Sequence, residues 1–110
     1  MPDKHLSSQF DADLNSLSLE MGGLVESQIA TAMRAFTQMD IDTCNVVIEN
    51  EKLVNDLEIQ IDSACTELIA RRQPTARDLR LVMAVSKAIT NLERAGDEAE
   101  RVAKRTKRLI

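Results

Sequence analysis

The sequence has almost no aromatic residues: two Phe, no Tyr and no Trp among 110 residues. β-Sandwiches and barrels rely on aromatic and β-branched strands, and many short strands need frequent turns. This chain has only three Gly and two Pro, so long helices with an aliphatic core fit the composition better. A chain of this length is one domain by default.

Long apolar runs are also absent. The longest unbroken run, residues 81–85, is far shorter than the roughly 20 residues that a membrane-spanning helix needs. The first ten residues lack the apolar core of a signal peptide. On one helix Cys44 and Cys65 would lie about 31 Å apart, too far for a disulfide. We therefore expect a reduced, cytoplasmic protein.

Charge is unevenly distributed along the chain. Residues 1–70 contain 3 Lys or Arg against 13 Asp or Glu, a net charge of −10, and residues 71–110 contain 11 against 5, a net charge of +6. A basic end can indicate nucleic-acid binding. Here the cations fall at the end of the last expected helix, where they complement the helix dipole, so we expect no nucleic-acid partner.

Two breaks divide the chain into three helices. Pro74 cannot continue a helix, and Thr75 with Asp78 has the spacing of a capping box. Earlier in the chain, Asp40 or Asp42 can cap the next helix. The expected fold is all-α, an up-down-up three-helix bundle of long antiparallel helices, forming a single domain over residues 1–110 with helices at 5–38, 42–71 and 75–109.

Each helical segment carries apolar residues in steps of three and four, which predicts the face that packs in the core. In the first segment this stripe is Phe10, Leu14, Leu17, Met21, Val25, Ile29, Ala32 and Phe36. In the second it is Val47, Asn50, Val54, Leu57, Ile61, Ala64 and Leu68. In the third it is Val82, Val85, Ile89, Leu92, Gly96, Ala99, Ala103 and Thr106.

Carboxylates four positions apart recur beside these stripes. Residues at i and i+4 share a helix face, and Glu93 with Asp97 forms such a pair on the third helix. If helices two and three are antiparallel about a turn near residues 73–74, residue 93 lies level with about residue 54. Glu51 and Asn55 then face the pair, with Glu100 one turn further along.

A second motif, Glu58 with Asp62, has the same spacing but sits about 10 Å away along the axis by this estimate. We therefore favour the first set. Facing like charges repel unless a cation lies between them, and oxygen ligands suit hard or borderline cations. The predicted ligand is a divalent or ferric ion (iron, manganese, zinc, nickel or magnesium), held by Glu51, Asn55, Glu93, Asp97 and Glu100. A solvated acidic helix face is the competing interpretation.

Catalytic motifs are missing from the sequence. A ferritin-like di-iron core needs two Glu-x-x-His motifs, and the only histidine is His5. No residue pattern nominates a nucleophile with its base or a site for an organic cofactor. We expect that the protein is not an enzyme, with a metal-dependent hydrolase or oxidase as the least favoured alternative.

Three stretches together resemble the PhoU family of bacterial phosphate-uptake regulators: residues 21–28 (MGGLVESQ), 70–83 (ARRQPTARDLRLVM) and 92–99 (LERAGDEA). The resemblance covers nearly the whole chain. It implies the first of two similar three-helix repeats, with metal bound in some members by facing Glu/Asp-x-x-x-Asp motifs. In this sequence those motifs fall on Glu51 to Asn55 and on Glu93 to Asp97, and Asn55 departs from the acidic pattern.

The resemblance also implies a function. A PhoU-like protein represses the phosphate-starvation response and modulates phosphate uptake by contacting the ATPase of a phosphate ABC transporter and a sensor histidine kinase. It would be peripheral to the membrane through these partners only. We further expect a homodimer. The strip of Gly96, Ala99 and Ala103 is one candidate surface, and packing within the bundle is the other use that its small residues allow. The alternative is a structural helical module that self-associates and has no signalling partner.

Overall fold

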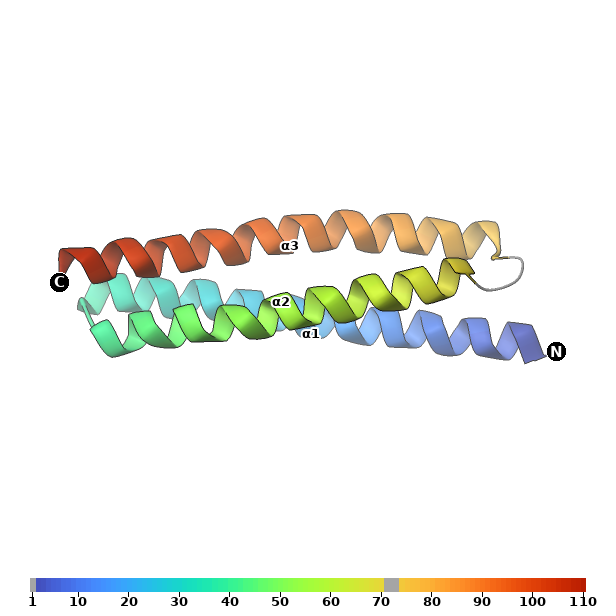
Figure 1. Ribbon diagram of the computed structural model, residues 1–110, viewed down its shortest axis with the longest axis horizontal. Helices are drawn as coiled ribbons and strands as arrows, with labels where there is room; N and C mark the ends of the chain where they lie inside the picture. The colour runs from blue at the N-terminus through green and yellow to red at the C-terminus, as the bar shows by residue number, and fades with distance from the viewer. Residues whose placement is uncertain (1, 71–73) are drawn as a thin grey trace.

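The computed structural model describes residues 2–70 and 74–110, with side chains from residue 11 onward. It contains three α-helices: α1 (Pro2–Gln38), α2 (Ile41–Ala70) and α3 (Ala76–Leu109). They run up, down and up in one bundle, as predicted (Figure 1). Helix α1 begins three residues before the expected start, and the expected end of the second helix at residue 71 lies outside the described residues.

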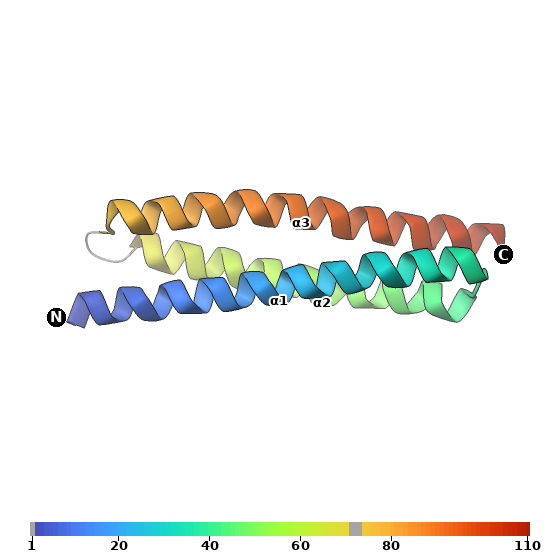
Figure 2. The ribbon, with the colours of Figure 1, turned by 180° about the vertical axis from the view of Figure 1, so that it is seen from behind.

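The bundle is a narrow rod measuring 59 × 17 × 16 Å (Figure 2). Its radius of gyration is 17.1 Å, whereas a compact domain of this length has about 13 Å. The C-terminus lies at the same end as the α1–α2 connection, and the N-terminus lies at the other end. In the described part of the chain, no helix has an apolar stretch long enough to cross a membrane.

The start of α3 is fixed by the predicted capping box. The Thr75 hydroxyl accepts a hydrogen bond from the Asp78 backbone N–H at 3.0 Å, and the Asp78 carboxylate accepts one from the Thr75 N–H at 2.9 Å. Two otherwise unpaired N–H groups of the first turn are thereby satisfied. The local sequence alone therefore sets this helix boundary.

The connection between α1 and α2 is a tight turn around Met39. Met39 has a φ of 52°, and the Asp40 N–H donates to the Ala35 carbonyl at 3.2 Å, the pattern of a Schellman C-cap. The Asp40 carboxylate then accepts the Asp42 N–H at 3.1 Å. Of the two expected caps for α2, Asp40 is therefore the one that the structure uses.

Met39→Gly should stabilise the chain by about 0.5–1 kcal/mol, because glycine adopts this left-handed conformation without the steric penalty of a side chain. The extra chain entropy of glycine in the unfolded state reduces the gain. Urea unfolding of the two proteins measures the difference. Met33→Gly, at an exposed position inside α1, is the control and should be destabilising by about 1 kcal/mol.

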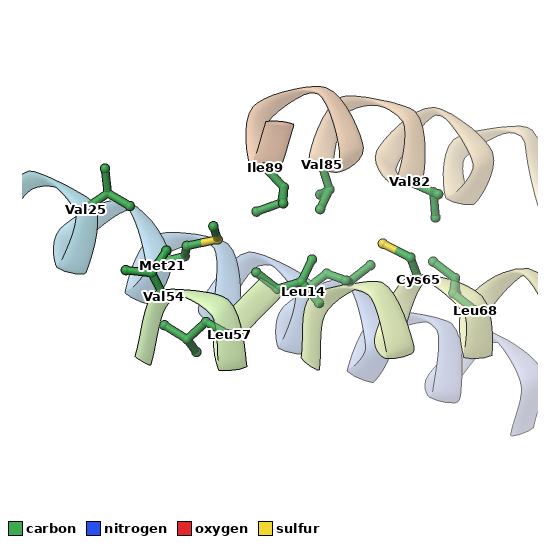
Figure 3. Close-up of a cluster of buried hydrophobic side chains, with 11 residues drawn as sticks. Leu14, Met21, Val25, Val54, Leu57, Cys65, Leu68, Val82, Val85 and Ile89 are labelled. Atoms are coloured by element: carbon green, nitrogen blue, oxygen red, sulfur yellow. The ribbon is translucent and has the colours of Figure 1, made fainter. Parts of the chain in front are cut away.

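Two apolar clusters fill the interior. The larger one occupies the half of the bundle nearer the α2–α3 connection (Figure 3) and comprises Leu14, Met21, Val25, Val54, Leu57, Ile61, Cys65, Leu68, Val82, Val85 and Ile89. The smaller one lies toward the α1–α2 connection and comprises Ala32, Ala35, Cys44, Val47, Ala99 and Ala103. Both cysteines are free and buried.

The predicted stripes were right for α3 and partly wrong for α1. All the expected α3 residues are buried except Leu92, which is partly buried. On α1 the buried positions after Val25 are Gln28, Ala32 and Ala35, whereas Ile29 and Phe36 are exposed. Gln28 and Ala35 continue the alternating steps of three and four along the buried face of α1, although the residues that follow them, Ile29 and Phe36, are more hydrophobic.

The strip of small residues on α3 faces the inside of the bundle. Gly96, Ala99 and Ala103 are all buried, and the two alanines pack against α1 and α2 in the smaller cluster. The strip is therefore used for close helix packing within one chain. Of the two uses considered for this strip, the structure shows packing within the bundle and not a self-association surface.

Candidate carboxylate site

The most unusual residue in the bundle is a buried acid, Glu51, in the middle of α2. Only 3% of Glu51 is exposed, and it lies along α2 between Val47 of the smaller cluster and Val54 of the larger one. Charged side chains are rarely buried without a partner. The acid that we predicted beside the core stripe is therefore an interior polar group.

A glutamine from α1 holds one oxygen of this carboxylate. Gln28, 2% exposed, donates its side-chain N–H groups to the Val47 carbonyl at 2.7 Å and to Glu51 Oε2 at 3.3 Å. The amide thus links α1 to two successive turns of α2. The sequence analysis did not identify Gln28, although Gln28 is a polar residue at the correct spacing for the buried face of α1.

A glycine from α3 makes room for the other oxygen. A Cβ added at Gly96 would lie 3.0 Å from Glu51 Oε1 and 3.4 Å from Oε2. Oε1 is buried and has no hydrogen-bond partner among the described residues. Gln28, Glu51 and Gly96 therefore form one polar layer across all three helices, with an unsatisfied acceptor at its centre.

The electrostatic environment of Glu51 disfavours its charged form. Burial raises the pKa of Glu51 above its usual value, the hydrogen bond from Gln28 opposes this shift, and the charges of Glu100, Asp97 and Glu93 add to it. All three of these carboxylates come from α3. The structure therefore brings four of the five predicted site residues into one electrostatic group.

Glu93 has a second neighbour that we had placed too far away. Burial raises the pKa of Glu58, and the charge of Glu93 and a hydrogen bond between the two side chains raise it further. Helix side chains lean toward the N-terminus of their own helix, so on antiparallel helices Glu58 and Glu93 lean toward each other. Our estimate from the sequence compared only the axial positions of the Cα atoms and ignored the direction of the side chains. Glu58 therefore lies beside Glu93 and belongs to the neighbourhood of the site.

Three of the predicted residues lie nearer the solvent than Glu51. Asn55 and Asp97 are exposed, and Glu100 is half-buried and ion-paired with Lys104 at 3.6 Å. Beside them is an open hollow of about 350 Å³ on α3, with a lining of two acids and four cations: Asp97, Glu100, Arg101, Lys104, Arg105 and Arg108.

The carboxylates do not yet form a coordination sphere. Among the residues with described side chains, no three His, Cys, Asp or Glu converge in a group that could hold a metal ion. The donor chemistry nevertheless fits a hard cation, because only oxygen ligands are offered and one of them, Glu51 Oε1, lacks a partner.

Comparison with known proteins identifies the family. The family model described as the PhoU domain matches residues 18–106. The chain belongs to the PhoU family. The match includes α1 from residue 18, all of α2, α3 up to residue 106, and the Gln28–Glu51–Gly96 layer.

Curated relatives extend the match over nearly the whole chain. A phosphate-specific transport system accessory protein PhoU homolog from Burkholderia sp. is 57% identical over 112 residues, covering 99% of this chain and 48% of the relative. The protein of that name from Escherichia coli K12 is 49% identical, covering 92% and 43%, and a homolog from Pseudomonas aeruginosa is 44% identical, also covering 92% and 43%. The chain thus spans just under half the length of these relatives. No solved structure matched it.

Proposed function

We propose that this PhoU-family chain is a regulatory adaptor of phosphate uptake, which represses the phosphate-starvation response by contacting a phosphate ABC transporter ATPase and a sensor histidine kinase. The observation that carries the proposal is the family match along the bundle, together with relatives named as accessory proteins of a phosphate-specific transport system. Such an adaptor acts in the cytoplasm and reaches the membrane through its partners. Its role is regulatory and not catalytic.

Capture experiments test this proposal directly. The purified chain should retain the transporter ATPase and the cytoplasmic part of the sensor kinase from the same bacterium, each tested alone. A fragment of equal length from an unrelated three-helix bundle is the control. If neither protein is captured, the adaptor proposal is wrong and the alternative, a structural self-association module, is favoured.

The cluster of acidic side chains around Glu51 favours an adaptor that depends on a bound metal ion. We propose that Glu51, Glu93, Asp97 and Glu100 hold a divalent or ferric ion (iron, manganese, zinc, nickel or magnesium), with Asn55 as a weaker oxygen donor and Glu58 beside Glu93. Two features support this proposal. One oxygen of Glu51 is buried without a partner among the described residues, and three acids on α3 raise the pKa of Glu51. A cation placed among these carboxylates would bind the unpaired oxygen and offset the repulsion between the negative charges. Bound there, the ion would cross-link α2 and α3.

Metal addition should raise the melting temperature of the chain, because a ligand that binds only the folded state stabilises it by mass action, about 2.7 kcal/mol at a hundredfold excess over Kd. Manganese, zinc, nickel and ferrous iron would each be titrated in a thermal-unfolding assay. The shift should be lost in Glu93→Gln/Asp97→Asn.

A matched variant controls for net charge. Glu49→Gln/Glu67→Gln removes the same two charges from exposed positions of α2 and should keep the full metal-induced shift. Equal shifts in the wild type and in Glu93→Gln/Asp97→Asn would show that the acids form a solvated face and not a site.

We also propose that the chain self-associates. The relatives carry about as many residues again outside the aligned region, and a homodimer would bring two three-helix units together as a closed, two-fold assembly. The strip on α3 that we first considered is buried, so another surface must serve.

A further inference from the structure

The outer side of α3 carries a row of positive charges along most of its length. The buried residues of α3 all occupy two positions of a heptad, and the position that faces away from them recurs every seven residues. A cation occupies this outward position in five successive repeats, and all five side chains are exposed: Arg80, Lys87, Arg94, Arg101 and Arg108. We call these five residues the cationic row. Its members lie about 10.5 Å apart along the axis, and the whole row is about 42 Å long.

The bundle itself gives no reason for this row. The favourable effect of the helix dipole is confined to the last turn of a helix, whereas Arg80, Lys87 and Arg94 lie in the first and middle parts of α3. Among the residues with described side chains, Arg101 is the one member of the row that has an acidic partner, Glu98. The row therefore presents positive charge that neither the dipole nor ion pairs within the chain use.

Negative charge is concentrated on the other two helices. α3 contains nine Lys or Arg against five Asp or Glu, whereas α2 contains one against seven and α1 contains two against five. Figures 1 and 2 show α3 as one long edge of the rod, with α1 and α2 together on the other side. Charge is thus polarised across the rod, and an anionic surface would orient the rod with α3 toward that surface.

We infer that the cationic row lies against the anionic headgroups of a lipid bilayer. A plane offers negative charge at every point along the row, and each Lys or Arg close to such a surface adds to the attraction. Packed helices are about 8–10 Å apart, which is about one Debye length at physiological salt, so the acids of α1 and α2 are largely screened from the surface. This direct lipid contact adds to the partner contacts proposed above and does not depend on them.

Two other kinds of anionic partner fit the row less well. The backbone of duplex DNA winds once in about 34–36 Å, so a straight row would meet phosphates only where a strand crosses it. Single strands are held by stacking on aromatic side chains, and α3 has none. A protein interface has an apolar centre, whereas every member of the row is charged. A bilayer surface requires neither aromatic nor apolar contacts.

Flotation of the chain with lipid vesicles, in the presence of a chelator, tests the inference. Vesicles of phosphatidylcholine with 30% phosphatidylglycerol should bind the chain at 50 mM NaCl, and vesicles of phosphatidylcholine alone should not. Raising NaCl to 300 mM should weaken the binding at least tenfold, because salt screens exposed charges. Absence of binding to the anionic vesicles at 50 mM NaCl would overturn the inference.

A matched pair of variants tests whether the row is the surface that binds. Arg80→Gln/Lys87→Gln removes one Arg and one Lys from the row and should weaken vesicle binding at least tenfold. Arg34→Gln/Lys52→Gln removes one Arg and one Lys from exposed positions of α1 and α2, and should change binding less than threefold. Equal losses in the two variants would show that net charge alone governs binding and would overturn the assigned surface. Circular dichroism checks that both variants keep the helix content of the wild type.

Competition with DNA identifies the class of partner. A duplex of 40 base pairs, added at the same concentration of phosphate as the anionic lipid, should leave the chain on the vesicles. Displacement of the wild type by the duplex would assign the row to nucleic acid and overturn the lipid contact. Capture of the transporter ATPase and the kinase without lipid remains a separate readout, so a failure of vesicle binding is distinguishable from a failure of the adaptor function.

Discussion

Glu51→Gln should be about 1–2 kcal/mol more stable than the wild type at pH 7.5 in the presence of a chelator. A buried acceptor without a partner costs about 1–3 kcal/mol, and more when it is charged. Glu51 Oε1 is such an acceptor, and three acids on α3 surround the carboxylate. Glutamine has nearly the same shape, keeps an oxygen for the hydrogen bond from Gln28, and carries no charge.

The stability advantage of Glu51→Gln over the wild type should increase as the pH rises. The pKa of Glu51 is raised in the folded state from its ordinary value of 4.5, so the folded chain binds this proton more tightly than the unfolded chain. Stability from this group is then fully present below about pH 4.5 and is lost as the pH rises through the folded-state pKa. The variant lacks this loss, so the two stability curves should converge at low pH.

Urea unfolding at a series of pH values from 4 to 8 measures both effects. Glu49→Gln, an exposed position on the same helix, is the matched control and should follow the wild-type curve. Parallel curves for the wild type and Glu51→Gln would mean that Glu51 carries no ionisation cost in the folded chain. The same substitution should reduce the metal-induced stabilisation, which would link the buried acid to the proposed cation.

The helix boundaries were predictable because local chemistry determines them. Pro74 cannot lie inside a helix, and Thr75 and Asp78 cap α3 through groups three residues apart. The core face of α3 was equally predictable, since nearly every position of its heptad seam is apolar or small. In these regions the periodicity allowed only one assignment of the buried face.

On α1 two seams run side by side, and hydrophobicity alone did not separate them. Ile29 and Phe36 are more apolar than Gln28 and Ala35, yet the latter pair is buried. The choice is made by tertiary packing: Gln28 supplies the hydrogen bonds that Val47 and Glu51 need. The more apolar pair, Ile29 and Phe36, is left exposed on α1.

On α2 the burial of Glu51 was missed because the sequence allows two heptad stripes through Val54. One continues through Leu57, as predicted, and the other passes through Glu51 and Cys65. The structure buries Leu57 from the first stripe and Glu51 and Cys65 from the second, so periodicity alone does not select the buried positions. The depth of Glu51 also depends on its contact with Gly96, a contact between helices that no local pattern specifies.

Gly96→Val should cost about 2 kcal/mol or more, because overpacking a filled interior costs about 1–3 kcal/mol. The first added carbon already lies 3.0 Å from Glu51 Oε1, and the two further methyl groups have to fit in the same buried layer. The smaller change Gly96→Ala should be close to neutral, since its gain in helix propensity of about 1 kcal/mol offsets the tighter contact.

A double-mutant cycle identifies the contact responsible. In a Glu51→Ala background the opposing carboxylate is gone, so Gly96→Val should cost less than half as much, and Gly96→Ala should become stabilising by up to about 1 kcal/mol. We expect a coupling energy between the two positions of about 1–2 kcal/mol, obtained from urea unfolding of the four proteins. Ala84→Val, at an exposed position of the same helix, should show no coupling to Glu51. Additive effects at positions 51 and 96 would mean that α3 adjusts elsewhere and that Gly96 does not maintain the space that the buried carboxylate occupies.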